Sequence, residues 1–189
     1  MRKLKLQVQI TIDGFISGKN GEMDWMCFQW SDDIMEYVTA LTESVDTILL
    51  GRKLAEGFIP HWEQVAMNPE HPEHEAGLKF ASTHKVVFSK SIPQSIWDNA
   101  SVASGDLAEE ITKLKSLPGN DLIVYGGGTF VSSLIEAGLI DEFHLFVNPT
   151  AIGEGMSIFG SLSKNLALKP KTVKLFDCGI TLLCYERSN

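Results

Sequence analysis

The chain has 189 residues, of which 44% are hydrophobic and 21% charged, and its formal net charge is -8. A chain of this length fits one domain that buries about 70% of its unfolded surface, so it needs no disulfide or structural metal. The negative charge and the scatter of the 16 basic residues argue against a nucleic-acid-binding protein, because binding to phosphate backbones relies on clusters of Lys and Arg.

Cysteine usage and hydropathy indicate the compartment. The three cysteines, Cys27, Cys178 and Cys184, form no CxxC pair, as a reducing cytosol permits. No apolar signal segment follows Met1, and no apolar run reaches the roughly 18 residues that a bilayer requires. We therefore expect a cytoplasmic protein with free thiols that contacts no membrane.

The first third of the chain predicts a strand, a long loop and a helix. Apolar and polar residues alternate over 3–10, which is typical of a strand with one buried face. Three glycines within 11–21 predict a loop, which at this length is either functional or a mobile surface connection. Ser31 is a good N-cap for an amphipathic helix, and Asp32 and Asp33 suit its positive end.

A second strand, over 45–50, ends at Gly51-Arg52-Lys53, and a helical pattern begins there. Two cations in the first turn of a helix oppose its dipole. Solvation of Arg52 and Lys53 would explain them, but an anion bound at this helix end explains them better.

The stretch that most suggests a ligand site is Asp121–Phe130, where an apolar strand runs into Gly126, Gly127 and Gly128 and then into a helical pattern. Three glycines remove every Cβ, permit positive φ, and let the phosphates of a nucleotide approach backbone N–H groups at the helix start. A plain tight turn is the alternative, and the glycines alone do not decide between the two.

The remaining segments complete an α/β pattern. We predict a third strand over 85–89, a helix from Asp106 to 117, a strand over 143–147 and a hairpin over 172–185. Pro72 separates His71 from His74 in a polar loop, so we expect no metal site. Strands that alternate with helices before a final hairpin predict a single domain over 1–189 with a mixed, mostly parallel sheet covered on both faces.

Five short segments, in this order, resemble the dihydrofolate reductase-like superfamily, and within it the branch of the reductase domain of bacterial riboflavin biosynthesis. They are Thr11–Gly18 with Asp24-Trp25, Ile48–Lys53, Val86–Lys90, Val124–Thr129, and Leu139–Pro149 with Gly153–Gly155. The resemblance spans nearly the full chain. It implies a three-layer α-β-α fold whose mostly parallel mixed sheet ends in an antiparallel hairpin.

The resemblance also implies NADPH as cofactor. Its pyrophosphate would face Gly126, Gly127, Gly128 and Thr129, and its 2′-phosphate would lie near Arg52 and Lys53 after Gly51 and near Ser89 and Lys90. The loop over 13–21 would close on the nicotinamide, with Ile16 and Trp25 lining that pocket.

The substrate half departs from both relatives. The stretch from Trp25 to Asp33 lacks the Leu-Pro of folate reductases, and Phe15 stands where riboflavin reductases carry a basic residue. The resemblance implies hydride transfer to a C=N or C=O of a small pterin- or pyrimidine-like substrate, with Asp33, or second Asp13, as proton donor. The alternatives are 5-amino-6-(5-phosphoribosylamino)uracil reductase and a non-catalytic nucleotide-binding sensor or dimeric scaffold. A homodimer through the hairpin over 172–185 is expected.

Overall fold

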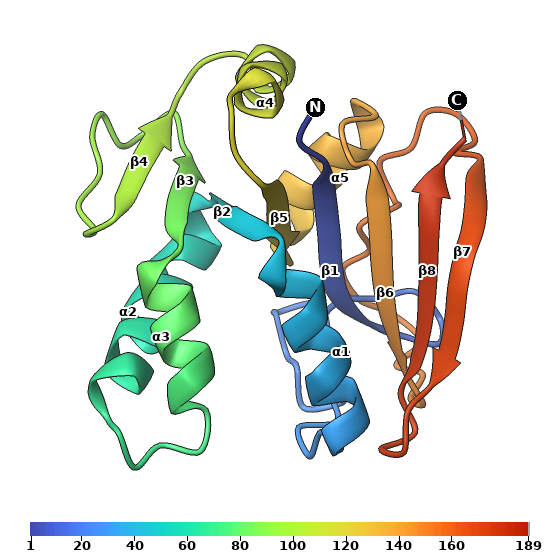
Figure 1. Cartoon of the computed structure of the whole chain (residues 1–189). Coiled ribbons are helices and arrows are strands. Elements are labelled where there is room, and N and C mark those ends of the chain that lie inside the picture. Colours follow the sequence, from blue (N-terminus) through green and yellow to red (C-terminus); the bar gives the residue numbers. More distant parts are fainter. Residues whose placement is uncertain (189) are drawn as a thin grey trace.

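The computed structural model describes residues 1–188 and contains one eight-stranded sheet (Figure 1). The spatial order is β4-β3-β2-β5-β1-β6-β8-β7. The first six strands in this order are parallel, while β8 runs antiparallel to both β6 and β7. The strands are β1 Leu4–Thr11, β2 Val45–Gly51, β3 His84–Phe88, β4 Ala100–Ala103, β5 Asp121–Tyr125, β6 Glu142–Asn148, β7 Leu168–Leu175 and β8 Thr181–Arg187.

Helices cover both faces of this sheet. One face carries α1 Asp32–Glu43, α2 Arg52–Met67 and α3 His74–Ser82, and the other carries α4 Leu107–Ser116 and α5 Gly128–Glu136. The apolar side chains of each face form separate cores with the helices that cover it. The predicted three-layer α/β fold, with a mixed sheet and a C-terminal antiparallel hairpin, is therefore confirmed.

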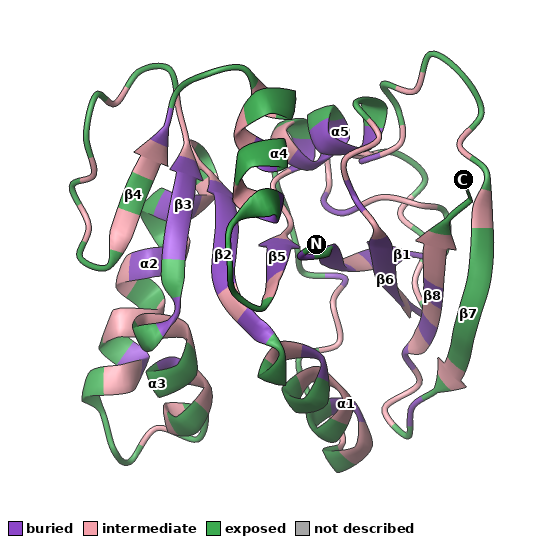
Figure 2. Cartoon of the chain, turned by 45° about the horizontal axis from the view of Figure 1, so that its top comes forward, coloured by how far each residue is buried: buried purple, intermediate pink, exposed green. Residues whose placement is uncertain are grey.

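The central strand β1 is buried on both faces, so the prediction of one buried face was wrong. Its apolar residues Leu4 and Leu6 are fully buried, but Lys5 and Gln7, on the opposite face, are only 8% and 9% exposed. Figure 2 shows that the central strands of the sheet are largely buried, whereas the edge strand β7 is exposed. A strand at the centre of a three-layer fold has no solvent side, whatever its pattern of polarity.

Two elements were not anticipated. The strand β4 has only four residues, Ala100–Ala103, and α3 follows directly on a polar, proline-containing segment. Both are held by neighbours: β4 pairs with β3, and α3 packs along α2. None of the helices in residues 1–188 is long and apolar enough to cross a membrane.

Candidate functional site

A cavity of about 920 Å³ lies at the carboxyl ends of the parallel strands. The helix α1 packs on β6 and β8, and α2 packs on β2 and β3, so the ends of β1 and β5 lie between the two helices. Ligands of open α/β sheets bind in this position. The cavity is lined by Gln7, Val8, Gln9, Ile16, Ser17, Gly21, Met23, Trp30, Gly51, Arg52, Lys53, Leu54, Phe58, Phe88, Tyr125, Gly126, Gly127, Gly128, Thr129, Phe130, Ser133 and Met156.

Two helices begin at this cavity without a capping side chain. The N-cap of α2 is Gly51 and that of α5 is Gly127, and neither helix has an acidic residue in its first turn. In contrast, α4 is capped by Asp106, whose Oδ1 accepts hydrogen bonds from the N–H groups of Ala108 and Glu109. The first N–H groups of α2 and α5 therefore have no side-chain cap and can donate to a bound anion.

The backbone turn at Gly126–Gly128 itself favours glycine, apart from any ligand. Gly126 and Gly127 have φ of 28° and 79°, in the left-handed region that favours glycine. A Cβ on Gly128 would lie 2.0 Å from Sδ of Met156, whereas a Cβ on Gly126 would meet nothing within 4 Å. The turn therefore packs closely on one side and leaves open space on the other.

The basic residues that we predicted to bind a phosphate group lie at the carboxyl ends of the strands, as the glycine turn does. Arg52 and Lys53 line the cavity, and Nη1 of Arg52 is 2.5 Å from Oε1 of Glu56. Ser89 and Lys90 are not part of the lining, but they directly follow Phe88, which pairs with Gly51 across β2 and β3.

The loop after β1 forms one side of the cavity through Ile16 and Ser17. Two backbone hydrogen bonds of 2.9 Å join these residues to Met156. The carboxylate of Asp13 accepts hydrogen bonds from the N–H groups of Ile152, at 3.1 Å, and Gly153, at 2.7 Å. Asp13 thus ties this loop to the segment before Met156 and lies outside the cavity lining.

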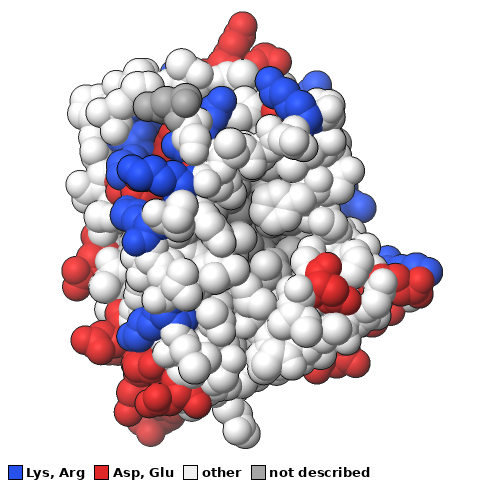
Figure 3. All heavy atoms as spheres, turned by 90° about the vertical axis from the view of Figure 1, so that its right-hand side faces the viewer, with Lys and Arg blue, Asp and Glu red and all other residues white. Residues whose placement is uncertain are grey.

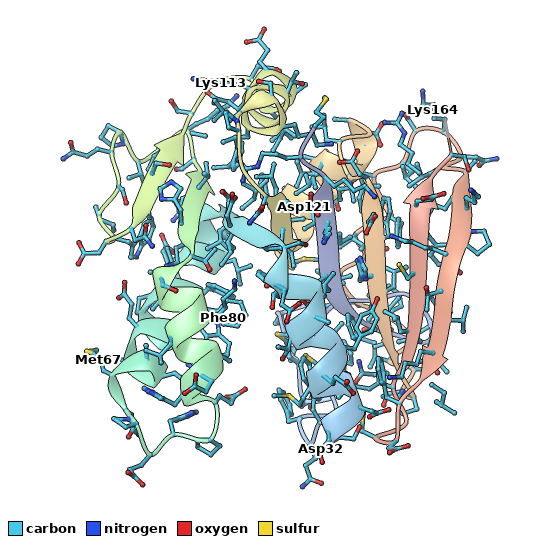
Figure 4. All side chains as sticks on the ribbon, viewed as in Figure 1. Asp32, Met67, Phe80, Lys113, Asp121 and Lys164 are labelled. Atoms are coloured by element: carbon cyan, nitrogen blue, oxygen red, sulfur yellow. The ribbon has the colours of Figure 1, made fainter. Side chains whose placement is uncertain are left out.

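Asp33 and Trp25 also lie outside the lining. Ser31 donates its hydroxyl hydrogen to Oδ1 of Asp33 at 2.5 Å, and the N–H of Asp177 donates to Oδ2 at 3.3 Å. Asp33 therefore connects the start of α1, marked by Asp32 in Figure 4, to the β7–β8 turn. Trp25 is buried, and its Nε1 has no hydrogen-bond partner within residues 1–188.

Both candidate proton donors are held as ionised carboxylates. The hydrogen bond from the Ser31 side chain holds the pKa of Asp33 below its ordinary value. Hydrogen bonds from the side chain of Thr11 and the N–H of Gly153 do the same for the pKa of Asp13. In these hydrogen bonds both groups are acceptors at neutral pH.

The residues that sequence analysis missed form the base and an aromatic wall of the cavity. Gln7 and Gln9 come from β1, Tyr125 ends β5, and Phe58 comes from α2, with its ring 5.5 Å from that of Tyr125. The polar residues that alternate with apolar ones along β1 could have indicated these site residues from the sequence. In a sheet covered on both faces, polar residues on a central strand must be buried and therefore have partners or line a site.

A polar cluster lies behind the cavity, under α1. Nδ1 of His144 is 2.9 Å from the hydroxyl of Tyr37, and its Nε2 is 3.4 Å from Oε2 of Glu142. Burial lowers the pKa of His144 to about 4, so the ring is neutral at pH 7. This cluster is not part of the cavity lining.

Comparison with known proteins agrees with the fold. Residues 2–182 match the family model of the RibD C-terminal domain. The uncharacterised protein YyaP of Bacillus subtilis is 36% identical over 188 residues, which cover 98% of this chain and 95% of that protein. A putative riboflavin biosynthesis protein from Shewanella sp. PV-4 superposes with a TM-score of 0.71 at 22% identity, over 100% of both chains.

A further solved structure shares the fold. Dihydrofolate reductase from Enterococcus faecalis, solved in complex with NADP(H), has a TM-score of 0.59 at 18% identity, over 99% of this chain and 97% of that one. At this identity the similarity concerns the fold alone. The match to the family model over nearly the whole length, together with YyaP, shows that this chain belongs to the RibD C-terminal domain family.

Proposed function

We propose that this protein is an NADPH-dependent reductase that transfers hydride to a C=N or C=O of a small pterin- or pyrimidine-like substrate. The observation that carries the proposal is the meeting of two uncapped helix N-termini, with Arg52 and Lys53, at one cavity of about 920 Å³. Such an arrangement suits a ligand with several phosphate groups.

The residues at the cavity suit the phosphate groups of NADPH in their chemistry. The N–H groups at the start of α5, from Gly128 and Thr129, would bind the pyrophosphate, while Arg52 and Lys53, with Ser89 and Lys90 beyond them, would bind the 2′-phosphate. Ile16, on the loop, would contact the nicotinamide. Bound NADPH would supply the hydride. The reductase fold in Enterococcus faecalis dihydrofolate reductase, which was solved with NADP(H), supports this choice of cofactor.

The source of the proton stays a prediction. Hydride transfer leaves negative charge on the acceptor heteroatom, so an acid or a water molecule must supply a proton. We propose Asp33 as the first candidate for the proton donor and Asp13 as the second. In the structure both carboxylates lie outside the cavity lining and accept hydrogen bonds from neighbouring residues. The assignment requires that Asp33→Asn lower kcat by about a hundredfold or more. A change under about threefold in both Asp→Asn variants would leave water as the donor.

The cofactor proposal is tested by fluorescence titration of the wild type with NADPH and with NADH. The Gly127→Val variant is compared, because a branched residue at φ 79° disturbs the turn on which the N–H groups of α5 depend. Gly57→Ala, at an exposed helical glycine, is the control. Tight NADPH binding that is lost only in Gly127→Val supports the proposal. A folded wild type that binds neither nucleotide would refute it.

Two alternatives predict different activities. The resemblance to the riboflavin branch favours 5-amino-6-(5-phosphoribosylamino)uracil reductase as an alternative, although Phe15 lies where that branch has a basic residue. A non-catalytic nucleotide sensor would bind NADPH without consuming it. NADPH oxidation measured with that uracil substrate, with pterins and with small carbonyl compounds separates the three.

We also propose a homodimer that forms through the C-terminal hairpin. β7 is an edge strand whose Val173 and Leu175 are 65% and 70% exposed. Figure 3 shows basic side chains in a column along one edge of this side of the molecule and an area without charged side chains beside them. An exposed edge strand with apolar residues favours pairing with a second copy.

A further inference from the structure

Two of the three cysteines meet at the end of the molecule where α1 begins. Cys27 belongs to the segment that precedes α1, and Cys178 belongs to the turn between β7 and β8, at the same end of the molecule (Figure 1). The Sγ of Cys27 lies 4.0 Å from the backbone carbonyl oxygen of Cys178, so the two residues are in contact although they are 151 positions apart in the chain. Both thiols are free and half-buried, and both residues pack against the same apolar core.

Backbone hydrogen bonds hold the two segments together at this contact. The N–H of Cys178 donates to Oγ of Ser31 at 3.2 Å, and the N–H of Asp177 donates to Oδ2 of Asp33 at 3.3 Å. Neither Cys27 nor Cys178 lies in a helix or a strand, so a small shift of either backbone breaks no ladder of hydrogen bonds. A disulfide requires Cα atoms about 4.4–6.8 Å apart, a separation that contacting residues on adjustable segments can reach.

Cys178 has the features of a thiol that reacts with oxidants. Burial opposes its ionisation, but hydrogen bonds from the N–H groups of Ile180 and Ser31 outweigh burial and lower its pKa. The thiolate is the reactive form, and oxidant-sensitive cysteines are accessible and have a second thiol beside them. Cys27 is that second thiol. In contrast, Cys184 on β8 is 2% exposed, and burial raises its pKa.

We propose that Cys27 and Cys178 form a reversible disulfide when the protein meets a peroxide, and that this bond fixes the segment before α1 against the β7–β8 turn. The thiolate of Cys178 attacks one oxygen of hydrogen peroxide, the O–O bond breaks, hydroxide leaves, and the sulfur becomes a sulfenic acid. The sulfur of Cys27 then attacks that sulfur, the S–O bond breaks, and the thiol proton of Cys27 leaves with the hydroxide as water. Two thiols are thereby oxidised to one disulfide, and one peroxide is reduced to two water molecules.

The disulfide would restrain one wall of the cavity without touching a bound ligand. Trp30, which closely follows Cys27 in the chain, lines the cavity, whereas neither cysteine does. The N–H of Cys27 donates to Oδ1 of Asn148 at 2.9 Å. The Nδ2 of Asn148 in turn donates to Oε1 of Gln9, which is part of the lining. The inference goes beyond the proposed reductase function and does not depend on it.

Peptide mapping by mass spectrometry tests the proposal directly. The wild type is treated with a small excess of hydrogen peroxide, its remaining thiols are blocked with N-ethylmaleimide in denaturant, and the protein is digested without reduction. We expect a link between the peptides that contain Cys27 and Cys178, within one chain, while Cys184 carries the maleimide. Dithiothreitol should remove the link completely.

Three variants separate the roles of the thiols. Cys27→Ser should form no disulfide and should accumulate a sulfenic acid at Cys178, which dimedone traps. Cys178→Ser should lose both the link and the dimedone adduct at that position. The control is Cys184→Ala, which should form the same link as the wild type, because the buried thiol takes no part.

The disulfide should also change stability and local exchange. It joins residues 151 positions apart and so constrains the unfolded chain. We expect the Tm of the oxidised wild type to exceed that of the reduced wild type by about 5 °C or more. Amide hydrogen exchange over residues 23–30 should slow on oxidation. Cys27→Ser, treated with peroxide in the same way, should change its Tm by less than about 1 °C.

Three results would overturn the inference. The first is a folded wild type that forms no link between Cys27 and Cys178, whether its thiols stay reduced or end as sulfinic acids. The second is a link between separate chains alone, which would show that the thiols meet by collision and not within the fold. The third is a Tm of the linked protein below that of the reduced protein, which would mean that the fold must distort to form the bond. Titration of the reduced protein with NADPH tests the proposed function independently of these results.

Discussion

Glu142 is a buried carboxylate held by two lysines at the start of β6. Its Oε1 accepts hydrogen bonds from Nζ of Lys3 at 2.6 Å and of Lys171 at 2.8 Å, and its side chain is 5% exposed. Burial opposes ionisation and raises the pKa, but the hydrogen bonds from Lys171 and Lys3 outweigh it and lower the pKa to about 2. Glu142 thus joins three strands, because Lys3 precedes β1 and Lys171 belongs to β7.

The pKa of Glu142 predicts how stability depends on pH. A carboxyl group whose pKa is lower in the folded state stabilises the protein above its unfolded pKa, near 4.5, and this contribution is lost as the pH falls toward 2. We expect Glu142→Gln to lower the free energy of unfolding at pH 7 by about 2 kcal/mol or more, because two lysines lose their partner. Urea unfolding from pH 7 to 3 should show this difference narrowing below pH 4.5.

The control for Glu142→Gln is the residue beside Glu142 on the neighbouring strand β8. Glu186, its register partner on β8, pairs with Lys169 at 3.0 Å in a more exposed position. We expect Glu186→Gln to change the stability by less than about 0.5 kcal/mol, as for most surface ion pairs. Equal effects of the two substitutions would contradict the role given to burial.

Gly155 illustrates a close approach of backbone to backbone. A Cβ at this position would lie 2.2 Å from the carbonyl oxygen of Ser17, on the loop that borders the cavity. We predict that Gly155→Ala lowers the free energy of unfolding by about 1–3 kcal/mol and weakens NADPH binding, because the Ser17 backbone must move. Gly57→Ala, with open space around the new Cβ, should instead stabilise by about 0.5–1 kcal/mol. Thermal melts of the two variants that shift in the same direction would contradict this prediction.

At the scale of elements, α2 and α5 differ from α4 in how they begin. Asp106 caps α4, and Glu109 and Glu110 complement its dipole, so the start of α4 is locally stabilised. The start of α2 carries Arg52 and Lys53 instead. A helix end with unfavourable charge, beside a cavity, is stabilised when an anion binds there.

This argument predicts a trade between stability and binding at Lys53. Lys53→Glu should raise the free energy of unfolding by about 0.3–1 kcal/mol, because an acidic residue complements the helix dipole. It should also weaken NADPH binding by about tenfold or more, and weaken NADH binding less, because the contact proposed for Lys53 is with the 2′-phosphate. Fluorescence titration and urea unfolding measure the two effects.

The matched control is Lys113→Glu, in the last turn of α4, where Figure 4 shows Lys113 at the far end of the molecule from Asp32. There an acidic residue opposes the dipole, so stability should fall slightly while NADPH binding stays unchanged. A loss of NADPH affinity in both variants would show that net charge, and not the site, controls binding.

At the scale of the whole molecule, the asymmetry of the sheet bears on assembly. At one end the short strand β4 is an edge, and at the other end the eight-residue strand β7 is an edge with Val173 and Leu175 exposed. Lys169 and Lys171 also lie on β7, and lysine discourages unrestricted pairing of edges. A closed two-fold dimer satisfies both features, because it covers the edge only once.

The dimer predicts a molecular mass of about twice 20.9 kDa in light scattering at micromolar concentration. Val173→Glu should give the mass of one chain, because it places a charge in the proposed interface. The control is Ile96→Glu, since Ile96 is 73% exposed but lies between β3 and β4, away from the hairpin. A wild-type protein that is monomeric at this concentration would refute the proposed dimer.

Local chemistry made much of this fold predictable from sequence. The cap at Asp106, the glycine turn that follows β5, and the hairpin turn at Gly179, whose φ is 87°, each depend on residues that are neighbours in the chain. Such neighbours specify strands, helices and turns without distant contacts. The same stretches carried the family resemblance, and hence the three-layer fold and the expected phosphate-binding end.

Only the tertiary structure decided which polar residues are buried and which meet. Gln7 and Gln9 look like the solvent face of a strand, and they line the cavity because β5 and β6 flank β1. The family resemblance predicts that Asp33 is a substrate-facing acid, and only the structure shows that its Oδ2 accepts a hydrogen bond from the N–H of Asp177, 144 positions away in the chain. Burial and long-range hydrogen bonding depend on how all three layers pack together. A local sequence pattern carries no information about that packing.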